Sequence, residues 1–175
     1  DRGPSSYEVI MLTKKLKEAM NNRLIILRGS HEYMLLNNSK KLSDRLLLRM
    51  VGRGATLRSF SKNGAYLYNN MSWIEKNTVL SYEDIFFQCA HAGVLFEPIE
   101  KNDEYTLLMN HNLVRKNIYN GKLTITGHIH LKKPCYFDGK GGKKDILKYN
   151  KQLKLPKTGV ICIDTSCAEG GKLTA

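Results

Sequence analysis

Leu123 to His130 reads LTITGHIH, and this stretch decides the fold that we expect. Its first four residues, Leu123 to Thr126, are apolar or β-branched and suit a short buried strand. Gly127 then permits a sharp turn and a close approach of the backbone to a ligand. The turn leaves His128 just beyond the carboxyl end of the predicted strand.

Three other apolar runs are predicted strands. Leu24–Leu27 and Ile85–Ala90 also end close to a glycine and a histidine, and Gly159–Asp164 ends near Thr165 and Ser166. The first leads to Gly29 and His31, and the second leads directly to His91. In open α/β sheets, ligands bind at the carboxyl ends of the strands. The sequence therefore predicts an α/β fold in which His31, His91 and His128 reach one polar edge of the sheet.

Apolar residues at helical spacing predict three helical stretches. The first begins near Ser5 and Ser6, whose hydroxyls can cap its first amide groups, and ends at Asn21. Its apolar positions are Val9, Leu12, Leu16 and Met20. The other two helical stretches are expected from Tyr33 to about Met50 and within Leu57 to Val79.

The chain carries a formal net charge of +12, with 28 basic against 16 acidic residues. Such an excess favours anionic partners, among them nucleotides, phosphorylated proteins and nucleic acid. The densest basic stretch, Lys132 to Lys157, is predicted to be a solvated loop. Nucleic acid stays open as a partner but is not favoured, because no zinc knuckle, RNA-recognition signature or aromatic-rich basic helix is present.

The cysteines and the hydropathy pattern favour a cytoplasmic protein without a membrane span. No run of about 18 apolar residues occurs, and no secretory signal opens the chain. The four cysteines lack CxxC spacing, so we expect reduced thiols and no zinc site built from them. Cys89 and Cys162 lie in apolar runs and are expected to act as small hydrophobic residues. With 175 residues, 42% of them hydrophobic, the chain fits a single domain.

The residue types in the glycine and histidine motifs suggest metal and acid–base chemistry. Neutral imidazole is the commonest metal ligand in proteins, and His128 and His130 can share one side of an extended turn. An imidazole that transfers a proton needs a carboxylate to fix its orientation. Asp1 and Glu32 are the candidates to orient His31.

Arginines near the same motifs are candidate phosphate clamps, because the forked donors of guanidinium match phosphate oxygens. These arginines are Arg2, Arg28 and Arg115. The fifth histidine, His111, follows no apolar run and has no glycine beside it. We therefore expect His111 at the surface.

Five motifs, taken in order, resemble the calcineurin-like metallophosphoesterase superfamily. They are DRGPSSYEVI, LIILRGSHE, CAHAG, TGHIH and GVICIDTSCAEGGKLTA. The chain is most similar to the serine/threonine protein phosphatases and their bacterial relatives, which include symmetrical diadenosine tetraphosphatases. The resemblance covers essentially the whole chain. It implies a single domain over residues 1–175, built as a metallophosphoesterase-type β-sandwich flanked by helices.

The resemblance also implies a role for individual positions. Asp1 matches the aspartate that orients the catalytic histidine, and His31 matches that histidine, which protonates the leaving group. Arg2 matches the arginine that holds the substrate phosphate, and Arg115 aligns with a second one. The expected metal ligands are His91, His128, His130 and, at the family's asparagine position, Ser30.

The activity implied is hydrolysis of phosphate esters by a water molecule that two divalent transition metals activate. Manganese is the expected metal, with iron or zinc as alternatives, since a mixed imidazole and carboxylate shell does not choose sharply among them. The substrate would be a phosphoprotein or a nucleotide. Two alternatives are a phosphatase-like module that binds without cleaving and a dinucleoside polyphosphate hydrolase.

The sequence departs from the family pattern at its ends and at two internal positions. The first metal motif and the bridging aspartate of the family are expected upstream of Asp1, and its last strand beyond Ala175, so we expect a truncated domain. Ser30 replaces an asparagine, and a hydroxyl is a poorer metal ligand than an amide carbonyl. Ser166 replaces a glycine that is common after the IDT motif.

Overall fold

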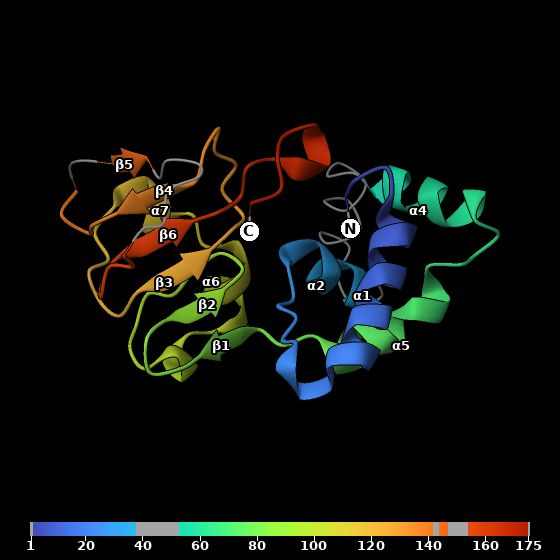
Figure 1. Cartoon of the computed structure of the whole chain (residues 1–175), viewed down its shortest axis with the longest axis horizontal. Coiled ribbons are helices and arrows are strands. Elements are labelled where there is room, and N and C mark those ends of the chain that lie inside the picture. The colour runs from blue at the N-terminus through green and yellow to red at the C-terminus, as the bar shows by residue number, and fades with distance from the viewer. Residues whose placement is uncertain (1, 38–52, 142–143, 147–153, 175) are drawn as a thin grey trace. The chain divides into compact units, whose positions relative to one another are not determined.

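The computed structural model describes residues 2–37, 53–141, 144–146 and 154–174 (Figure 1). The chain divides into two compact units. A helical unit comprises Asp1–Ile26 and Ser30–Val79, and a sheet unit comprises Leu27–Gly29 and Leu80–Ala175. The class predicted from the sequence, α/β, is confirmed.

In the helical unit, α1 packs against α4 and α2 packs against α5. The elements of this unit are α1 (Ser6–Met20), η1 (Asn21–Arg23), α2 (Ser30–Leu36), α4 (Arg53–Lys62) and α5 (Tyr68–Asn77). The Tyr7 and Phe60 rings meet edge to face at 5.3 Å, and Phe60 is only 1% exposed. Residues 38–52, which hold most of the helix predicted from Tyr33, lie outside the described residues.

A residue of another helix caps the start of α1, in place of the two serines that the sequence predicts as caps. Ser5 makes no side-chain cap, and the Ser6 hydroxyl donates to the Gly3 carbonyl at 2.8 Å. The amide of Tyr7 donates instead to the Ser59 hydroxyl on α4 at 3.0 Å, and that hydroxyl donates to a Glu8 carboxylate oxygen at 3.2 Å. The predicted cap was wrong because a serine 52 residues further along the chain competes for the same amide.

The apolar positions that predict α1 are not its buried face. Val9 is 59% exposed and Leu12 57%, and Leu16 and Met20 are also exposed. Ser6 is the buried residue of the helix, and its hydroxyl lies 3.4 Å from that of Thr56 on α4. The periodic pattern therefore identified the helix but not the side on which it packs.

The sheet unit contains a six-stranded mixed sheet with the order β1-β2-β3-β6-β4-β5. The strands are β1 (Ser81–Glu83), β2 (Gln88–Ala90), β3 (Thr124–Thr126), β4 (Cys135–Phe137), β5 (Lys144–Ile146) and β6 (Val160–Cys162). The central strands β2, β3 and β6 are parallel, and β1, β4 and β5 pair antiparallel with their neighbours. This is the only sheet in the described part of the chain, so the expected β-sandwich stays a prediction.

Two predictions about secondary structure differ from the structure. Leu24–Leu27 is not a strand: only Leu27 is a bridge residue, and the preceding Ile26 carbonyl accepts a hydrogen bond from the Val79 amide. Lys132–Lys157 is not simply a loop, because it supplies β4 and β5. The lysines on both sides of Cys135–Phe137 masked this short strand, in which Phe137 is fully buried.

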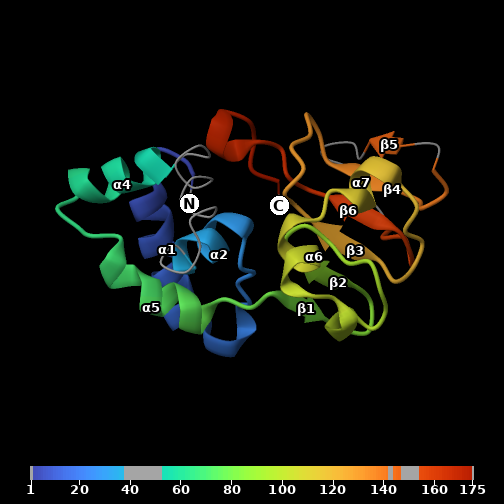
Figure 2. The same cartoon turned by 180° about the vertical axis from the view of Figure 1, so that it is seen from behind.

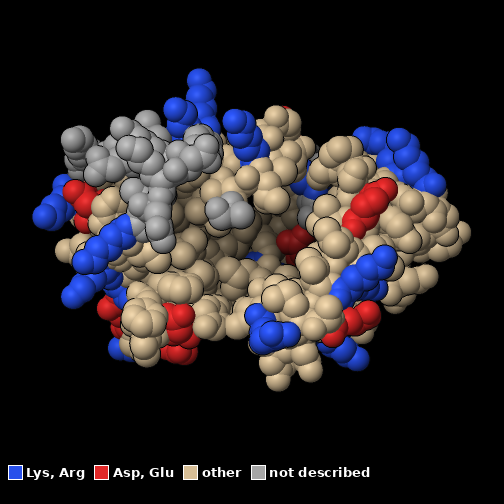
Figure 3. Space-filling model, viewed as in Figure 1, with Lys and Arg blue, Asp and Glu red and all other residues tan. Residues whose placement is uncertain are grey.

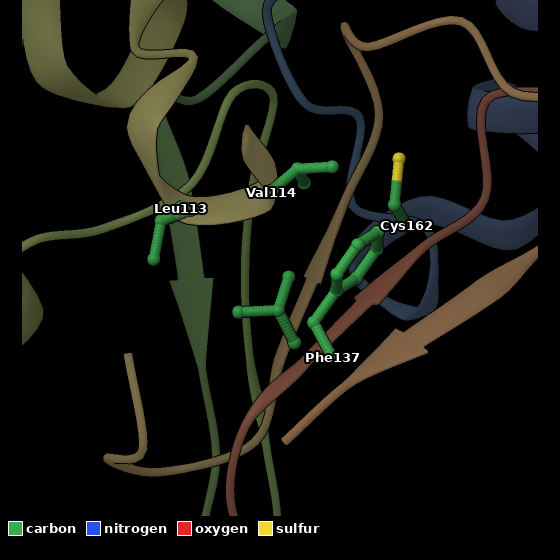
Figure 4. Close-up of a cluster of buried hydrophobic side chains, with 5 residues drawn as sticks. Leu113, Val114, Phe137 and Cys162 are labelled. Atoms are coloured by element: carbon green, nitrogen blue, oxygen red, sulfur yellow. The ribbon is translucent and has the colours of Figure 1, made fainter. Parts of the chain in front are cut away.

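Two short helices cover one face of the sheet (Figure 2). The hydrophobic core of the sheet unit lies between these helices and the strands. The two helices are α6 (Glu104–Met109) and α7 (Asn112–Lys116), and a short 3-10 helix, η2 (Ile99–Lys101), precedes them. Leu113 and Val114 of α7 lie over Phe137 of β4 and Cys162 of β6 (Figure 4). A second cluster joins Ala90, Val94, Ile99 and Leu107. None of these helices was recognised in the sequence, since they are short.

The basic residues are distributed over the surface with acidic residues between them, as the face drawn in Figure 3 shows. The excess positive charge is therefore not gathered into one broad patch on that face. Within the part of the chain that the structure describes, every helix is too short or too polar to cross a bilayer.

Replacing Phe137 by alanine should destabilise the protein by about 3–5 kcal/mol, because the ring is fully buried and its loss leaves a cavity. Phe86→Ala is the matched control: its ring is 71% exposed, so the change should stay within about 0.5 kcal/mol. Denaturant unfolding measures both. Equal effects of the two substitutions would contradict the packing described for β4.

Candidate functional site

The carboxyl ends of the three parallel strands carry the site residues of the sheet unit. Cys89 of β2 pairs with Ile125 of β3, which pairs with Ile161 of β6, so the three strands end in step. His91 follows β2 directly, and His128 and Asp164 each follow two residues beyond the ends of β3 and β6. The sequence predicts three histidines at this edge, and two of them, His91 and His128, are in contact there. The third, His31, follows no strand and lies in α2 of the helical unit, because the run before it forms no strand.

Hydrogen bonds hold the ends of these strands together. The His91 carbonyl accepts one bond from the Gly127 amide and one from the Thr126 hydroxyl, each at 2.9 Å. The Ile163 amide donates to the Thr126 carbonyl at 2.8 Å. The backbone that carries His91 is therefore fixed by β3, and the backbone after β3 is fixed by β6.

His91 and His128 are in direct contact through their ring nitrogens. His128 Nδ1 lies 3.2 Å from His91 Nε2, and the ring centroids are 5.0 Å apart. His128 has a φ of 65°, a left-handed conformation that non-glycine residues rarely adopt. One nitrogen of the pair carries the shared hydrogen and the other accepts it. The contact places one nitrogen of each imidazole side by side at the sheet edge.

His111 joins this pair, although the sequence predicts it at the surface. Its ring centroid is 4.6 Å from that of His128, and it is half-buried at the start of α7. Burial, with the positive charge of Arg115, lowers the pKa of His111 below its ordinary 6.5. The surface prediction was wrong because α7, which delivers His111, is too short to recognise by periodicity. No signal in the sequence would have found it.

Arg115 lies one helical turn beyond His111, and its amide donates to the His111 carbonyl at 3.1 Å. The guanidinium is exposed but close enough to disfavour protonation of His111. The predicted phosphate-binding arginine is thus near the histidine cluster. Its predicted role stays a prediction.

His130 contacts carboxylates. Its Nδ1 lies 3.3 Å from a Glu169 oxygen and its Nε2 lies 3.8 Å from an Asp164 oxygen. The next residue, Leu131, donates its amide to the Asp164 carbonyl at 2.9 Å, which ties this segment to the end of β6. Asp164 and Glu169 were not among the residues predicted for the site. Asp164 could have been found, since it ends a predicted strand at the same edge.

The helical unit carries a second set of predicted residues. Arg2 Nη2 donates a hydrogen bond to His31 Nε2 at 2.9 Å. His31 lies in the first turn of α2, directly after Ser30, which begins that helix and is 5% exposed. Asp1 lies outside the described residues. Arg28 is half-buried and belongs to the sheet unit.

The described residues contain no group of three or more histidine, cysteine, aspartate or glutamate side chains already arranged to hold a metal ion. The closest candidate donors are the contacting imidazoles of His91 and His128. The chain matches no family model and no curated protein sequence. The resemblance to the metallophosphoesterases is therefore carried by the motifs alone.

The lowered pKa of His111 predicts a dependence of stability on pH. The folded protein binds this proton less readily than the unfolded chain, whose imidazole titrates near 6.5. The stabilising contribution is therefore present above pH 6.5 and decreases as the pH falls below it. Unfolding free energies measured from pH 8 to about pH 5, with His111→Gln for comparison, test this sign.

Replacing Arg115 by methionine should raise the pKa of His111, because it removes a positive charge that disfavours the imidazolium. NMR titration of the His111 ring in the presence of a chelator measures the pKa. Lys116→Met, on the same helix, is the control and should leave it nearly unchanged. A His111 that titrates at or above 6.5 in the folded protein would refute this assignment.

Proposed function

We propose that this protein is a metal-dependent phosphoesterase that hydrolyses phosphate esters, in the manner of the serine/threonine protein phosphatases it resembles. The observation that carries the proposal is the contact between His91 and His128. Two adjacent parallel strands deliver their imidazoles to one edge at 3.2 Å, and β6 delivers Asp164 to the same edge. Ligand sites form at such edges in α/β sheets.

The donor set fits a transition metal. Imidazole nitrogens with a neighbouring carboxylate suit manganese, iron or zinc better than magnesium or calcium, which prefer oxygen alone. His91 and His128 would hold the second metal, and His130 would be a ligand of the first. The family resemblance alone adds Ser30 as the weakest ligand of the second metal. Two bound metals would supply an activated water and stabilise charge on the phosphoryl group.

Arg2 and His31 would bind the phosphate and protonate the leaving oxygen. A guanidinium has donors only, so the bond between them means that His31 Nε2 accepts and bears no proton. The phosphate would take over the donors of Arg2, because charge-assisted bonds to phosphate are stronger than a bond to a neutral imidazole. His31 Nε2 would then be free to carry the proton for the leaving group, with Asp1 orienting the ring.

The backbone at Ser166 supports the family resemblance. The family has a glycine at this position, and Ser166 has a φ of 59°, in the left-handed region that glycine adopts without strain. A backbone that suits glycine at this position is what the resemblance would imply. The parallel strands with antiparallel neighbours are also compatible with half of a metallophosphoesterase sandwich.

Cys167 is an exposed thiol, which suits the reducing conditions of the cytoplasm that the sequence suggests. The substrate stays within the class that the motifs imply, a phosphoprotein or a nucleotide.

The second candidate function is a phosphatase-like module that binds phosphate without cleaving it. Ser30 favours this alternative, because a buried hydroxyl replaces the amide ligand at the second metal. Such a module would keep Arg2 and the histidine cluster but would hold metal weakly.

Manganese-dependent hydrolysis of p-nitrophenyl phosphate by the full-length protein tests the proposal. His31→Ala should lower kcat by about 100-fold or more, since general acid catalysis contributes that much. Arg2→Gln should mainly raise KM, and Arg58→Gln, an exposed arginine of the same unit, is its matched control. Turnover that needs no metal, or that survives in His31→Ala, would sink the proposal.

Metal content separates the enzyme from the binding module. The enzyme should retain two transition metals per chain after dialysis, and His128→Ala should lose the second. Ser30→Asn should tighten manganese binding, because an amide carbonyl is a better neutral ligand than a hydroxyl. Its unfolding temperature is measured alongside, since a larger residue enters a buried position. Weak metal binding with intact phosphate binding would favour the module.

A further inference from the structure

A cleft next to the sheet edge shares only His130 with the proposed reaction, and the rest of its lining has no role there. It has a volume of about 530 Å³, which is in the range of small-molecule sites, about 300–1,000 Å³. Its walls are the segment after β3, from His130 to Lys133, and the segment after β6, from Thr165 to Lys172. Both segments continue directly from the strands that carry the histidine cluster.

The charge of this cleft is positive. Lys132, Lys133 and Lys172 line it, against the single carboxylate of Glu169. Glu169 lies 3.3 Å from His130 Nδ1, so its charge is directed toward that imidazole. Lys132 and Lys133 are exposed and form no ion pair with a described residue. A cleft that collects like charges in this way raises the local concentration of anions.

Hydrogen bonds fix the loop that forms one wall. The Gly171 amide donates to the Ser166 carbonyl at 2.8 Å, and the Lys172 amide donates to the Thr165 carbonyl at 3.1 Å. The Thr165 hydroxyl returns a bond to the Lys172 carbonyl at 2.5 Å. A Cβ added at Gly171 would lie 2.0 Å from the Thr165 carbonyl oxygen, so only glycine permits this close approach. Lys172 is therefore held in place at the cleft.

The opposite wall is joined to this loop. The Leu131 amide donates to the Asp164 carbonyl at 2.9 Å, which connects the segment before Lys132 to the residue before Thr165. This hydrogen bond therefore holds the two lysine-bearing walls of the cleft next to each other. His130 lines the cleft and lies two residues from His128 of the histidine pair.

From this arrangement we infer that the cleft binds a second anionic group of the substrate. The inference rests on the proposed phosphoesterase function: the histidine edge would take the phosphate that is cleaved, and the lysines a further phosphate or carboxylate. Substrates with two anionic groups are therefore preferred to those with one. The cleft accommodates one small group, which favours this reading over a groove for a nucleic-acid strand.

Binding of inorganic pyrophosphate to the metal-free full-length protein tests the inference without relying on catalysis. Calorimetry gives the Kd for the wild type and for Lys132→Gln combined with Lys133→Gln. The double variant should bind about tenfold more weakly, since two charge-assisted contacts are lost. Lys101→Gln combined with Lys116→Gln removes the same charge from exposed positions elsewhere in the sheet unit and should change the Kd less than twofold.

Gly171→Ala tests the cleft without changing its charge. The added methyl group displaces the loop, so pyrophosphate binding should weaken while the circular dichroism spectrum stays that of the wild type. With active enzyme, the double lysine variant should lower kcat/KM for a bisphosphorylated substrate and leave that for p-nitrophenyl phosphate unchanged.

The outcomes separate this inference from the proposed function. Pyrophosphate binding that depends on the lysines supports the anion cleft even if no hydrolysis is detected. Equal Kd values for the two double variants would overturn the inference and leave the phosphoesterase proposal standing. Lysine-dependent binding of an RNA or DNA oligonucleotide that is tighter than pyrophosphate binding would also overturn it, in favour of nucleic acid.

Discussion

The His91 carbonyl accepts two hydrogen bonds from the end of β3, and the rest of the candidate site depends on this junction. Both donors, the Gly127 amide and the Thr126 hydroxyl, belong to the turn that precedes His128. The carbonyl therefore fixes where His91 leaves its strand relative to His128. Because the Ile163 amide binds the Thr126 carbonyl in turn, the end of β6 is fixed by the same turn. Three short strands, each of three residues, are thus made into one rigid edge.

The sequence could predict this edge because each strand is an apolar run that stops at a polar or flexible residue. Ile85–Ala90, Leu123–Thr126 and Gly159–Asp164 each contain a strand of the structure, although each strand is shorter than its run. The run Leu24–Leu27 has the same composition but pairs with no strand, since its neighbour is the single amide of Val79. An apolar run can form a strand, but it does so only where a neighbouring strand is available for backbone hydrogen bonds.

What the sequence could not predict are the contacts between distant segments. Ser59 caps α1 in place of Ser5, and α7 brings His111 to His128, from residues that no local pattern marks. The packing of α1 was also beyond the sequence. The apolar residues from Val9 to Met20 predict the helix, but they are exposed and do not show which element the helix packs against. The 2.9 Å bond between Arg2 and His31 brings together two motifs 29 residues apart, and their predicted roles stay predictions.

The cysteine beside the site supports a chemistry based on histidine. The single S–H of Cys162 is shared between the carbonyls of Gly127 and Ile129, whose oxygens lie 3.6 and 3.4 Å from Sγ, so it braces the turn that carries His128. Burial raises the pKa of Cys162 to about 11, and that of Cys89 on β2 to about 11 as well. Both thiols are therefore protonated at neutral pH, and a protonated thiol is a weak nucleophile. The thiols pack and brace the strand ends, so acid–base chemistry at this edge is left to the imidazoles and to the carboxylates of Asp164 and Glu169.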